Sequence, residues 1–562
     1  MEDVSESQLS GESPPRGLQR ELEKAGQGHL TSHWSSLSKE ERKKLCDQIV
    51  SLNLTELKVY LKGKEKRSGL GQKKKQKKTP LPINADQICS KANLISVSRD
   101  FHVQKGLYLI AEGKVAVLLL AGGQGTRLGT KLPKGCVDIK LPSKKTLFQI
   151  QAERILSLQK LAAEAKYGEG AQVQKPIIWY IMLSHFTRAY TEDYFEKNSY
   201  FGLQKEQIFF FTQGKLPCVS EDGKVLLESP SKVSEAPDGN GGIYRALRTS
   251  GCLKDMAKSG VEAIDCYSVD NLLVKAADPF FVGYCFNFGA ELGLRTVAKV
   301  SPNERVGVFV KKGKGVGVVE YSEIDSKSAA AVKEDGELLY NWSNICMQYF
   351  SRKFLEKVCK PKVELEYHVA AKNISTIDGL VKGLKLEKFI FDVFPLAKKT
   401  CLVEVSRSEE FAPVKNAFGE PRDSPDTARK LLMMLHRSWA EDAGASFKGK
   451  DDEGLEISPL ISYGGENLEM YEGKVVKAGT TIQDFEPHTQ ILDDAQKSPL
   501  AVRQTPKTIS QDSIAFQKVL KEIDEINLEE EQEKKEKGKK LIGVGVIASA
   551  ALFALGKLLK KF

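Results

Sequence analysis

A glycine-rich segment just after the first fifth of the chain combines backbone freedom with fixed positive charge. It reads LAGGQGTRLG over residues 120–129 and is followed by Pro133-Lys134-Gly135. Glycines let the chain turn tightly and present N–H groups to a phosphate, while Arg127 and Lys134 add the charge that a triphosphate requires. The glycine spacing differs from the dinucleotide-binding pattern, and no Gly-Lys-Ser/Thr follows as in a P-loop. The segment therefore predicts an anion-binding loop of another type.

Two further segments place polar side chains after apolar or glycine-rich residues. Asp270 follows the apolar run 263–269. A carboxylate where a strand ends beside a phosphate site is a natural ligand for Mg²⁺, which favours one or two carboxylates together with phosphate oxygens and water. From the residues alone, a turn or helix N-cap is an equally good interpretation of this aspartate. Asn240 lies in APDGNGGIYR (residues 236–245), and its amide offers both a donor and an acceptor to a base or a sugar.

These side chains need a scaffold, and the surrounding pattern predicts an α/β sheet. Four short apolar runs, residues 115–121, 177–183, 207–211 and 263–269, predict strands buried on both faces. Between the first two, Thr146 and Gln149 form a capping-box pattern before a run of apolar residues at helical spacing. Strand, glycine loop, helix and strand in this order predict parallel strands with ligands at their carboxyl ends.

The segments named above resemble those of the sugar-nucleotide pyrophosphorylases, in particular the eukaryotic UDP-N-acetylglucosamine pyrophosphorylase family. The resemblance extends from about residue 107 to residue 471. It implies a Rossmann-like, GT-A-like nucleotidyltransferase fold, with a central mixed sheet flanked by helices. It also implies that the chain makes UDP-N-acetylglucosamine and pyrophosphate from UTP and N-acetylglucosamine 1-phosphate, with Mg²⁺ or Mn²⁺ as cofactor.

The same resemblance implies roles for individual residues. Arg127, Lys134 and Lys415 match the catalytic residues that contact the phosphates, and Asp270 matches the metal and nucleotide-site aspartate. The matching substrate-binding residues are Leu120, Ala121, Gly122, Gly123, Gln213, Gly239, Asn240, Glu320, Tyr321, Asn344 and Lys388.

One departure from the family pattern affects the expected sugar. Trp342 and Ser343 stand where the family more often has Ala-Gly, so a preference for N-acetylgalactosamine or glucose 1-phosphate stays open. A non-catalytic, membrane-tethered nucleotide-binding scaffold is the alternative from another class of protein.

The charge of the chain is concentrated in two short segments. The 562 residues are 41% hydrophobic and 28% charged, with a formal net charge of +10. Residues 62–78 carry +8 and residues 534–562 carry +7, which leaves −5 for the rest of the chain. Because no aromatic residues interleave with the lysines of the first segment, a solvated linker is favoured over a nucleic-acid site. The ten cysteines include no C-x-x-C pair, which predicts free thiols in a reducing compartment.

We expect five parts along the chain. They are a helical N-terminal region (1–110) with the basic linker 62–78, a catalytic domain (111–410), a C-terminal domain (411–511), a charged helix (512–540) and a hydrophobic helix (541–559). The last part, flanked by lysines, predicts a C-terminal transmembrane helix, with an amphipathic or oligomerising helix as the alternative. A cytoplasmic enzyme, tail-anchored to an intracellular membrane and facing the cytosol, is the expected location.

Overall fold

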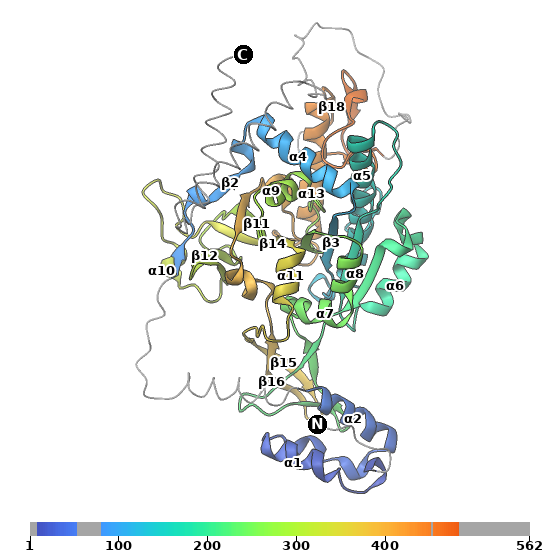
Figure 1. Cartoon of the computed structure of the whole chain (residues 1–562), viewed down its shortest axis with the longest axis vertical. Coiled ribbons are helices and arrows are strands. Elements are labelled where there is room, and N and C mark those ends of the chain that lie inside the picture. Colours follow the sequence, from blue (N-terminus) through green and yellow to red (C-terminus); the bar gives the residue numbers. More distant parts are fainter. Residues whose placement is uncertain (1–7, 53–79, 451–452, 483–562) are drawn as a thin grey trace, which may run out of the picture. The chain divides into compact units, whose positions relative to one another are not determined.

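The computed structural model describes residues 8–52, 80–450 and 453–482 (Figure 1). The chain forms two compact units, one of residues 1–83 and 90–492 and the other of residues 84–89 and 493–562. In the smaller unit, the described residues form a 3-10 turn, η4 (Ala85–Gln87), in which the Asn84 N–H donates to the side-chain oxygen of Gln87 at 3.3 Å. The elements described below belong to the larger unit.

A mixed β-sheet forms the centre of this unit, with strands in the order β17-β11-β14-β10-β3-β4-β5. The four strands predicted from sequence, β10, β3, β4 and β5, are parallel neighbours. Strand β14 runs antiparallel to both β10 and β11, while β11 and β17 are parallel. The strands are β3 (Val115–Leu120), β4 (Ile178–Leu183), β5 (Ile208–Thr212), β10 (Ala263–Ser268), β11 (Leu292–Ala298), β14 (Trp342–Ser351) and β17 (Thr400–Glu404).

Burial explains why the predicted strands formed and where one prediction was wrong. Every side chain of β3 is buried, and β4 and β10 are buried at all but one position each. Such continuous apolar runs are typical of parallel strands covered on both faces. Strand β5 was predicted to be buried on both faces as well, but four of its five residues are only half-buried. Among the described strands, β5 lies at the edge of the sheet, which explains the difference.

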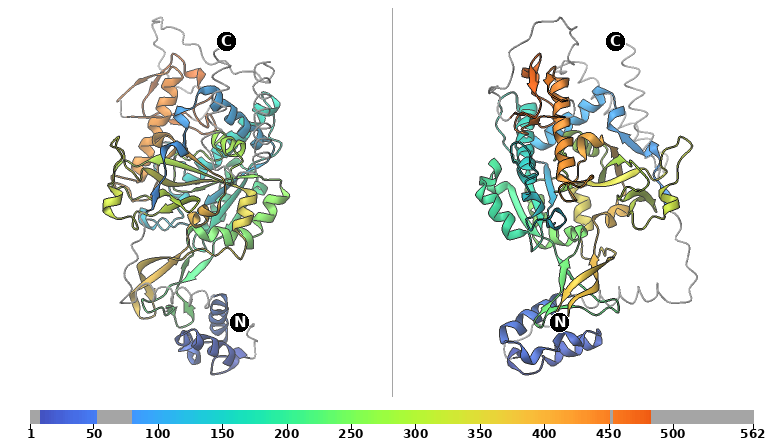
Figure 2. Two further views of the ribbon diagram at one scale, coloured as in Figure 1. Left: turned by 60° about the vertical axis from the view of Figure 1, so that its left-hand side comes forward. Right: turned by 180° about the vertical axis from the view of Figure 1, so that it is seen from behind.

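Helices cover both faces of the sheet (Figures 1 and 2). Helices α4, α5 and α9 pack together on one face, and α7, α8 and α11 gather on the other. Helix α5 begins as predicted, because the Thr146 hydroxyl accepts a hydrogen bond from the N–H of Gln149 at 3.5 Å; the Gln149 side chain donates instead to Glu153. The helices are α4 (Ser96–Ala111), α5 (Leu147–Tyr167), α6 (Arg188–Lys197), α7 (Ile243–Thr249), α8 (Cys252–Lys258), α9 (Pro279–Asn287), α10 (Ser326–Ala329), α11 (Arg352–Val358), α12 (Arg407–Glu410) and α13 (Pro425–Asp442).

Short hairpins and ladders extend from the central sheet. Strands β12 and β13 pair with each other, and β12 also pairs with β1 and with β14. Further pairs are β6–β9, β7–β8 and β15–β16. Their bounds are β1 (Leu81–Pro82), β6 (Lys215–Pro217), β7 (Leu227–Ser229), β8 (Lys232–Val233), β9 (Glu235–Pro237), β12 (Val308–Lys312), β13 (Gly315–Val319), β15 (His368–Thr376) and β16 (Gly379–Glu387).

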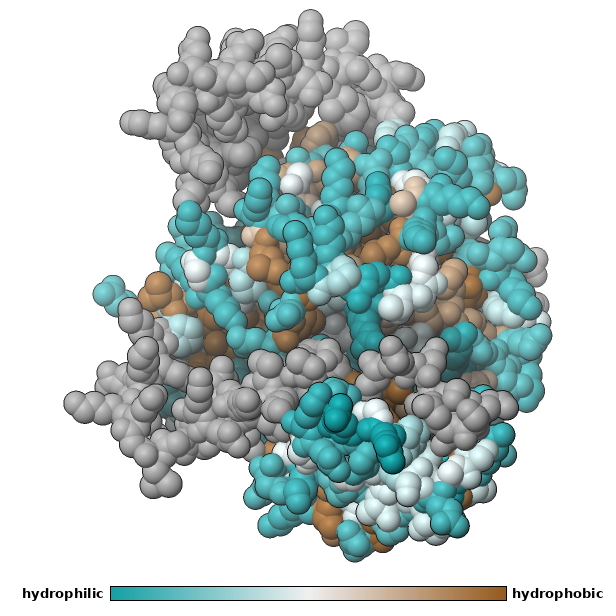
Figure 3. Space-filling model, turned by 60° about the horizontal axis from the view of Figure 1, so that its bottom comes forward, coloured by the Kyte–Doolittle hydropathy of each residue, from teal (hydrophilic) through white to brown (hydrophobic). Residues whose placement is uncertain are grey.

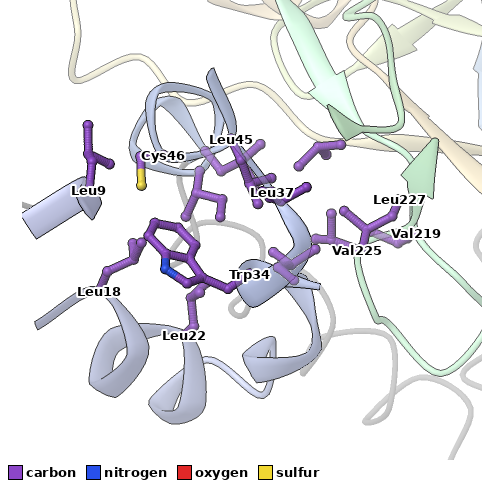
Figure 4. Close-up of a cluster of buried hydrophobic side chains, with 14 of the residues drawn as sticks. Leu9, Leu18, Leu22, Trp34, Leu37, Leu45, Cys46, Val219, Val225 and Leu227 are labelled. Carbon is purple, nitrogen blue, oxygen red and sulfur yellow. The ribbon is translucent and has the colours of Figure 1, made fainter. Parts of the chain in front are cut away.

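An N-terminal helical segment packs against the β7–β8 hairpin (Figure 4). Helices α1 (Arg16–Lys24) and α2 (Lys39–Ser51) enclose the fully buried Trp34, which belongs to one apolar cluster together with Val225 and Leu227 of the hairpin region. Gln48 on α2 accepts from the N–H of Val233 at 3.0 Å and donates to the Glu235 carboxylate at 2.9 Å. Both apolar packing and hydrogen bonds therefore hold this segment beside strand β9.

The chain after α13 forms two short parallel ladders, β18 (Ser446–Lys448) with β20 (Val475–Lys477) and β19 (Glu456–Ile457) with β21 (Thr481–Ile482). The Glu456 carboxylate accepts hydrogen bonds from the N–H and the hydroxyl of Ser143 at 2.9 and 2.5 Å, which joins these ladders to the segment before α5. On the face seen in Figure 3 the described residues are mainly hydrophilic, with hydrophobic residues in separate groups. Many apolar side chains are instead buried in the core, as expected of a folded domain.

The membrane assignment made from the sequence requires correction. Of the residues that the structure describes, none form a helix long and apolar enough to cross a membrane. The predicted hydrophobic helix, residues 541–559, the charged helix 512–540 and the basic linker 62–78 lie outside the described residues. The transmembrane helix, the tail anchor and the membrane partner that the sequence suggested are therefore withdrawn. The domain boundaries stay predictions.

Candidate active site

The parallel strands bring the predicted binding segments to one edge of the sheet. In register, Leu120 at the end of β3 lies beside Met182 of β4 and Ser268 of β10, and Leu183 lies beside Thr212 of β5. The glycine-rich loop follows β3, Gln213 follows β5 and Asp270 follows β10. Hydrogen bonds from Ala121 to Met182, from Val269 to Leu120 and from Gln213 to Leu183 continue the pairing past the strand ends. The carboxyl ends of these strands thus form a common site, as the topology of open α/β sheets predicts.

The glycines of the first loop have different structural tasks. Gly129 adopts a φ of +77° and ends the short 3-10 turn that carries Arg127. An added Cβ would lie 2.6 Å from Thr130 at Gly125 and 2.2 Å from the Phe148 ring at Gly135. These glycines permit close packing, whereas Gly123 is exposed, and an added Cβ there would lie in ordinary contact with Cδ of Lys134, at 4.0 Å. A ligand can therefore reach a shorter stretch of the loop backbone than the full run of glycines suggests.

A cluster of opposite charges lies at the ends of β3 and β10. Nζ of Lys134 is 3.3 Å from Oδ2 of Asp270, and the N–H of Val414 donates to the Asp270 carbonyl at 2.8 Å. Burial favours the neutral form of Asp270, but the positive charges of Lys134 and Lys415 outweigh it, so its pKa lies below the ordinary value. Lys134 therefore contacts Asp270, and the charge of Lys415 acts on the same carboxylate, while Arg127 is exposed on its turn.

Asn271 holds the strand end and the Lys415 segment together. Its Nδ2 donates to the carbonyl of Glu410 at 2.7 Å, and its Oδ1 accepts from the N–H of Ala412 at 2.9 Å. The neighbouring carbonyls of Leu272 and Val274 accept from the buried Arg154 of α5 at 2.7 and 2.8 Å. Sequence reasoning missed Asn271, although its position directly after Asp270 could have drawn attention to it.

Glu410, whose carbonyl accepts from Asn271, belongs to a buried ion network that no sequence signal indicated. The fully buried Arg295 of β11 contacts the carboxylates of Asp265 at 2.6 Å and Glu410 at 3.3 Å. Lys91 contacts the same Glu410 at 3.1 Å and Asp278 at 3.4 Å. Buried charges are stable only when they are paired in this way, so the network fixes the start of the segment that leads to Lys415.

A second group of predicted residues surrounds Gln213. Its Nε2 donates to Oδ1 of Asp238 and to the carbonyl of Gly239, both at 3.3 Å. Oδ1 of Asn240 accepts from the N–H of Ile390 at 2.9 Å, so that oxygen is engaged by the protein itself. The N–H of Lys388 donates to the Asp238 carbonyl at 2.8 Å, and its Nζ lies 4.5 Å from the centre of the Tyr367 ring. Gln213, Gly239, Asn240 and Lys388 are therefore neighbours, and Asp238 is an addition that sequence reasoning missed.

The predicted sugar residues form a third group beside strand β14. An added Cβ on Gly307 would lie 2.8 Å from Oε1 of Glu320, and the carbonyl of the same glycine accepts from the N–H of Asn344 at 2.8 Å. Burial, followed by the charge of Glu323, raises the pKa of Glu320. Tyr321 is half-exposed at 50%. Glu320 and Asn344 are thus brought together, with Tyr321 at the surface.

The three groups adjoin one another. Burial raises the pKa of the Cys346 thiol to about 12, and the charges of Asp270, Lys415 and Glu320 also act on it, so the Glu320 group and the Lys134–Asp270 cluster share surroundings. An added Cβ on Gly122 would lie 2.1 Å from Oε1 of Gln213, which joins the glycine-rich loop to the Gln213 group.

Trp342 and Ser343, the departures from the family pattern, are both buried in β14 opposite Ala298 and Val297 of β11. The structure therefore places both residues within the sheet.

The mixed sheet, its helices and the cation-lined loop at the strand ends fit a nucleotidyltransferase-like fold. The model of the family described as UTP–glucose-1-phosphate uridylyltransferase matches residues 58–483. UDP-N-acetylglucosamine diphosphorylase 2 of Arabidopsis thaliana is 45% identical over 464 residues, which cover 81% of this chain and 91% of that protein. UDP-N-acetylglucosamine pyrophosphorylase of Saccharomyces cerevisiae is 41% identical over 469 residues, 80% of this chain and 96% of that one.

Solved structures agree with these relatives. The uridine diphosphate N-acetylglucosamine pyrophosphorylase of Trypanosoma brucei, crystallised with an inhibitor, is 32% identical with a TM-score of 0.71, covering 84% of this chain and 95% of that one. The chain therefore belongs to the UTP–glucose-1-phosphate uridylyltransferase family, a family of enzymes. Pyrophosphorylases of this kind generally use a divalent metal ion.

Proposed function

We propose that this chain transfers the uridylyl group of UTP to N-acetylglucosamine 1-phosphate, forming UDP-N-acetylglucosamine and pyrophosphate. The observation that carries the proposal is the meeting of Lys134, Asp270 and Lys415 where the glycine loop and the Gln213 group converge. The names of the relatives, with 41 to 45% identity over about four fifths of the chain, support the same sugar nucleotide.

The reaction needs charge neutralisation and alignment more than acid–base catalysis. A phosphate oxygen of the sugar phosphate bonds to the α-phosphorus of UTP, and the bond from that phosphorus to the bridging oxygen breaks. The electron pair of the broken bond leaves with pyrophosphate. Because the nucleophile is already an anion, no strong general base is required, and catalysis depends on positioning and on positive charge. We assign Lys134 and Arg127 to the triphosphate and the leaving pyrophosphate, and Lys415 to the α-phosphate.

The residues at the site fit Mg²⁺, or Mn²⁺ in its place, provided that substrate phosphates and water supply the remaining ligands. The described residues contain no group of three or more His, Cys, Asp or Glu side chains that could hold a metal alone. Mg²⁺ commonly takes one or two carboxylates and completes its shell with substrate phosphates and water, so the charged carboxylate of Asp270 fits this need. When bound there, the ion would neutralise charge on the phosphates. The same carboxylate lies 3.3 Å from Nζ of Lys134.

The remaining predicted residues are assigned by position. The backbone of residues 120–123 lines the phosphate site, Gln213 contacts the base, and Gly239 and Asn240 contact the ribose. Glu320 and Asn344 hold the sugar, Tyr321 lies at the rim of that pocket, and Lys388 contacts a phosphate. These assignments combine the positions in the fold with the roles that the family resemblance implies.

A substrate panel tests the proposal directly. Pyrophosphate release is measured with UTP, Mg²⁺ and the 1-phosphates of N-acetylglucosamine, N-acetylgalactosamine and glucose. We expect the highest kcat/KM with N-acetylglucosamine 1-phosphate and a loss of about a hundredfold in kcat for Lys134→Ala. Lys131→Ala removes an exposed lysine of the same loop and is the matched control, with unchanged kcat expected. Preference for another sugar, or equal rates for the two lysine variants, would refute the corresponding assignment.

A further inference from the structure

Asp238 is a buried carboxylate in a space that two glycines leave open. Only 4% of the Asp238 surface is exposed to solvent. An added Cβ would lie 2.5 Å from its Oδ2 at Gly214 and 2.0 Å from its Oδ1 at Gly242. Neither glycine could therefore carry a side chain without moving the carboxylate. The space is shaped for the carboxylate of Asp238, which the mechanism above does not use.

The contact of Asp238 with Gln213 determines which way the Gln213 amide points. The amide end directed at Oδ1 of Asp238 and at the Gly239 carbonyl, both at 3.3 Å, faces two acceptors. It must therefore be the NH₂ group, since an amide oxygen there would be repelled by both. The opposite atom, Oε1, points to Gly122 of the phosphate loop. The Gln213 side chain thus presents its oxygen as an acceptor, because its NH₂ group already donates to Asp238 and Gly239.

Uridine and cytidine nucleotides differ in the group that such an acceptor meets. The N3 position of uracil is an N–H donor, whereas N3 of cytosine is an acceptor. A buried acceptor held in one orientation therefore favours uracil and leaves cytosine with two opposed acceptors. A site whose amide could turn over would accept either base, because the NH₂ group could face cytosine instead.

We propose that Asp238 is a positioning residue that holds the Gln213 amide with its oxygen toward the base and so selects uridine over cytidine nucleotides. This inference depends on the proposed function, in which Gln213 contacts the base.

The main-chain hydrogen bonds of Asp238 allow the side chain to be changed by itself. Its N–H donates to the Gly214 carbonyl at 3.2 Å, and its carbonyl accepts from Lys388 at 2.8 Å. Neither bond involves the carboxylate. Asparagine has the same shape as aspartate and can offer Gln213 either an oxygen or an NH₂ group, so that only the Gly239 carbonyl then opposes the turned Gln213 amide.

The test compares kcat/KM for UTP and CTP in the full chain carrying Asp238→Asn, Gln213→Ala or both. We expect each single variant to lower the UTP/CTP ratio by about tenfold or more. If Asp238 acts through Gln213, the double variant should match Gln213→Ala within about twofold, as a double-mutant cycle requires of coupled residues. Glu235→Gln is the matched control, because that carboxylate contacts Gln48, and its ratio should be unchanged.

Each result supports or refutes a specific step. An unchanged ratio for Gln213→Ala would refute the role of Gln213 in the proposed function. A lowered ratio for Gln213→Ala with an unchanged ratio for Asp238→Asn would refute the present inference alone. An equal effect of Asp238→Asn in the presence and absence of Gln213 would also overturn it. Asp238→Ala, which fits the same space, repeats the comparison with a second variant. Equilibrium binding of UMP and CMP repeats it without requiring turnover.

Discussion

Replacing Arg295 with methionine is expected to lower the free energy of unfolding by about 3–5 kcal/mol at pH 7. Arg295 is fully buried and pairs with Asp265 at 2.6 Å and with Glu410 at 3.3 Å. Without it, Glu410 keeps Lys91 at 3.1 Å, whereas the Asp265 carboxylate keeps the N–H of Ala277 at 2.7 Å and loses its buried cation. The cost therefore arises mainly at Asp265.

The magnitude follows from what a buried carboxyl group can do without its cation. It can take up a proton, which from an ordinary aspartate pKa of about 3.9 to pH 7 costs about 4 kcal/mol at about 1.4 kcal/mol per pH unit. This value sets an upper limit for the electrostatic part, and it agrees with measured costs of breaking buried pairs. The pKa of Asp265 in the variant lies above its unfolded value, so the deficit is largest at neutral pH and shrinks as the pH falls toward 4.

Urea denaturation of the full chain at pH 7 and pH 5 measures this deficit. Arg295→Met combined with Asp265→Asn should recover at least half of the loss, because the unpaired charge is gone. Arg295→Lys, which keeps the charge, should be less destabilised than the methionine variant. A loss below about 1 kcal/mol, a deficit independent of pH, or a double variant no more stable than the single one would refute the reasoning.

Three further predictions concern the site and its support. Arg127→Ala should lower kcat for pyrophosphate release by about a hundredfold with an unchanged melting temperature, because the proposed function assigns this exposed guanidinium to the phosphates; near-normal turnover would contradict this. Gly135→Ala should cost about 1–3 kcal/mol in urea denaturation, because the added Cβ would lie 2.2 Å from the Phe148 ring, and an unaltered midpoint would argue against that packing. Burial opposes the charge of Glu410, but Lys91 and two other cations outweigh it and lower its pKa to about 2. Glu410 should therefore contribute about 3 kcal/mol above pH 4.5, lost as the pH falls toward 2, and acid denaturation of Glu410→Gln should lack this component.

Local sequence patterns were sufficient to predict the strands and the loop that follow directly from them. The runs 115–121 and 263–269 became β3 and β10, because residues apolar at every position need cover on both faces. Helix α5 begins after Thr146, as its capping pattern predicted. The side chains of Lys134 and Asp270 could also be expected at one site, since parallel strands end at the same edge. The hydrophobic run at 541–559 is the opposite case, since apolar composition alone led to a membrane assignment that no helix of the described residues supports.

The sequence by itself determined the features set by near neighbours, namely the apolar runs, the glycine turn at Gly129 and the cations beside it. The tertiary structure decided which distant segments meet. It inserted the antiparallel β14 between β10 and β11, brought the Lys415 segment to Asp270 through Asn271, and paired Arg295 with Glu410. The spacing of residue types along the sequence does not predict such contacts. Strand order depends on how the whole core packs, and the pairing of buried charges depends on the cost of leaving a buried charge unpaired.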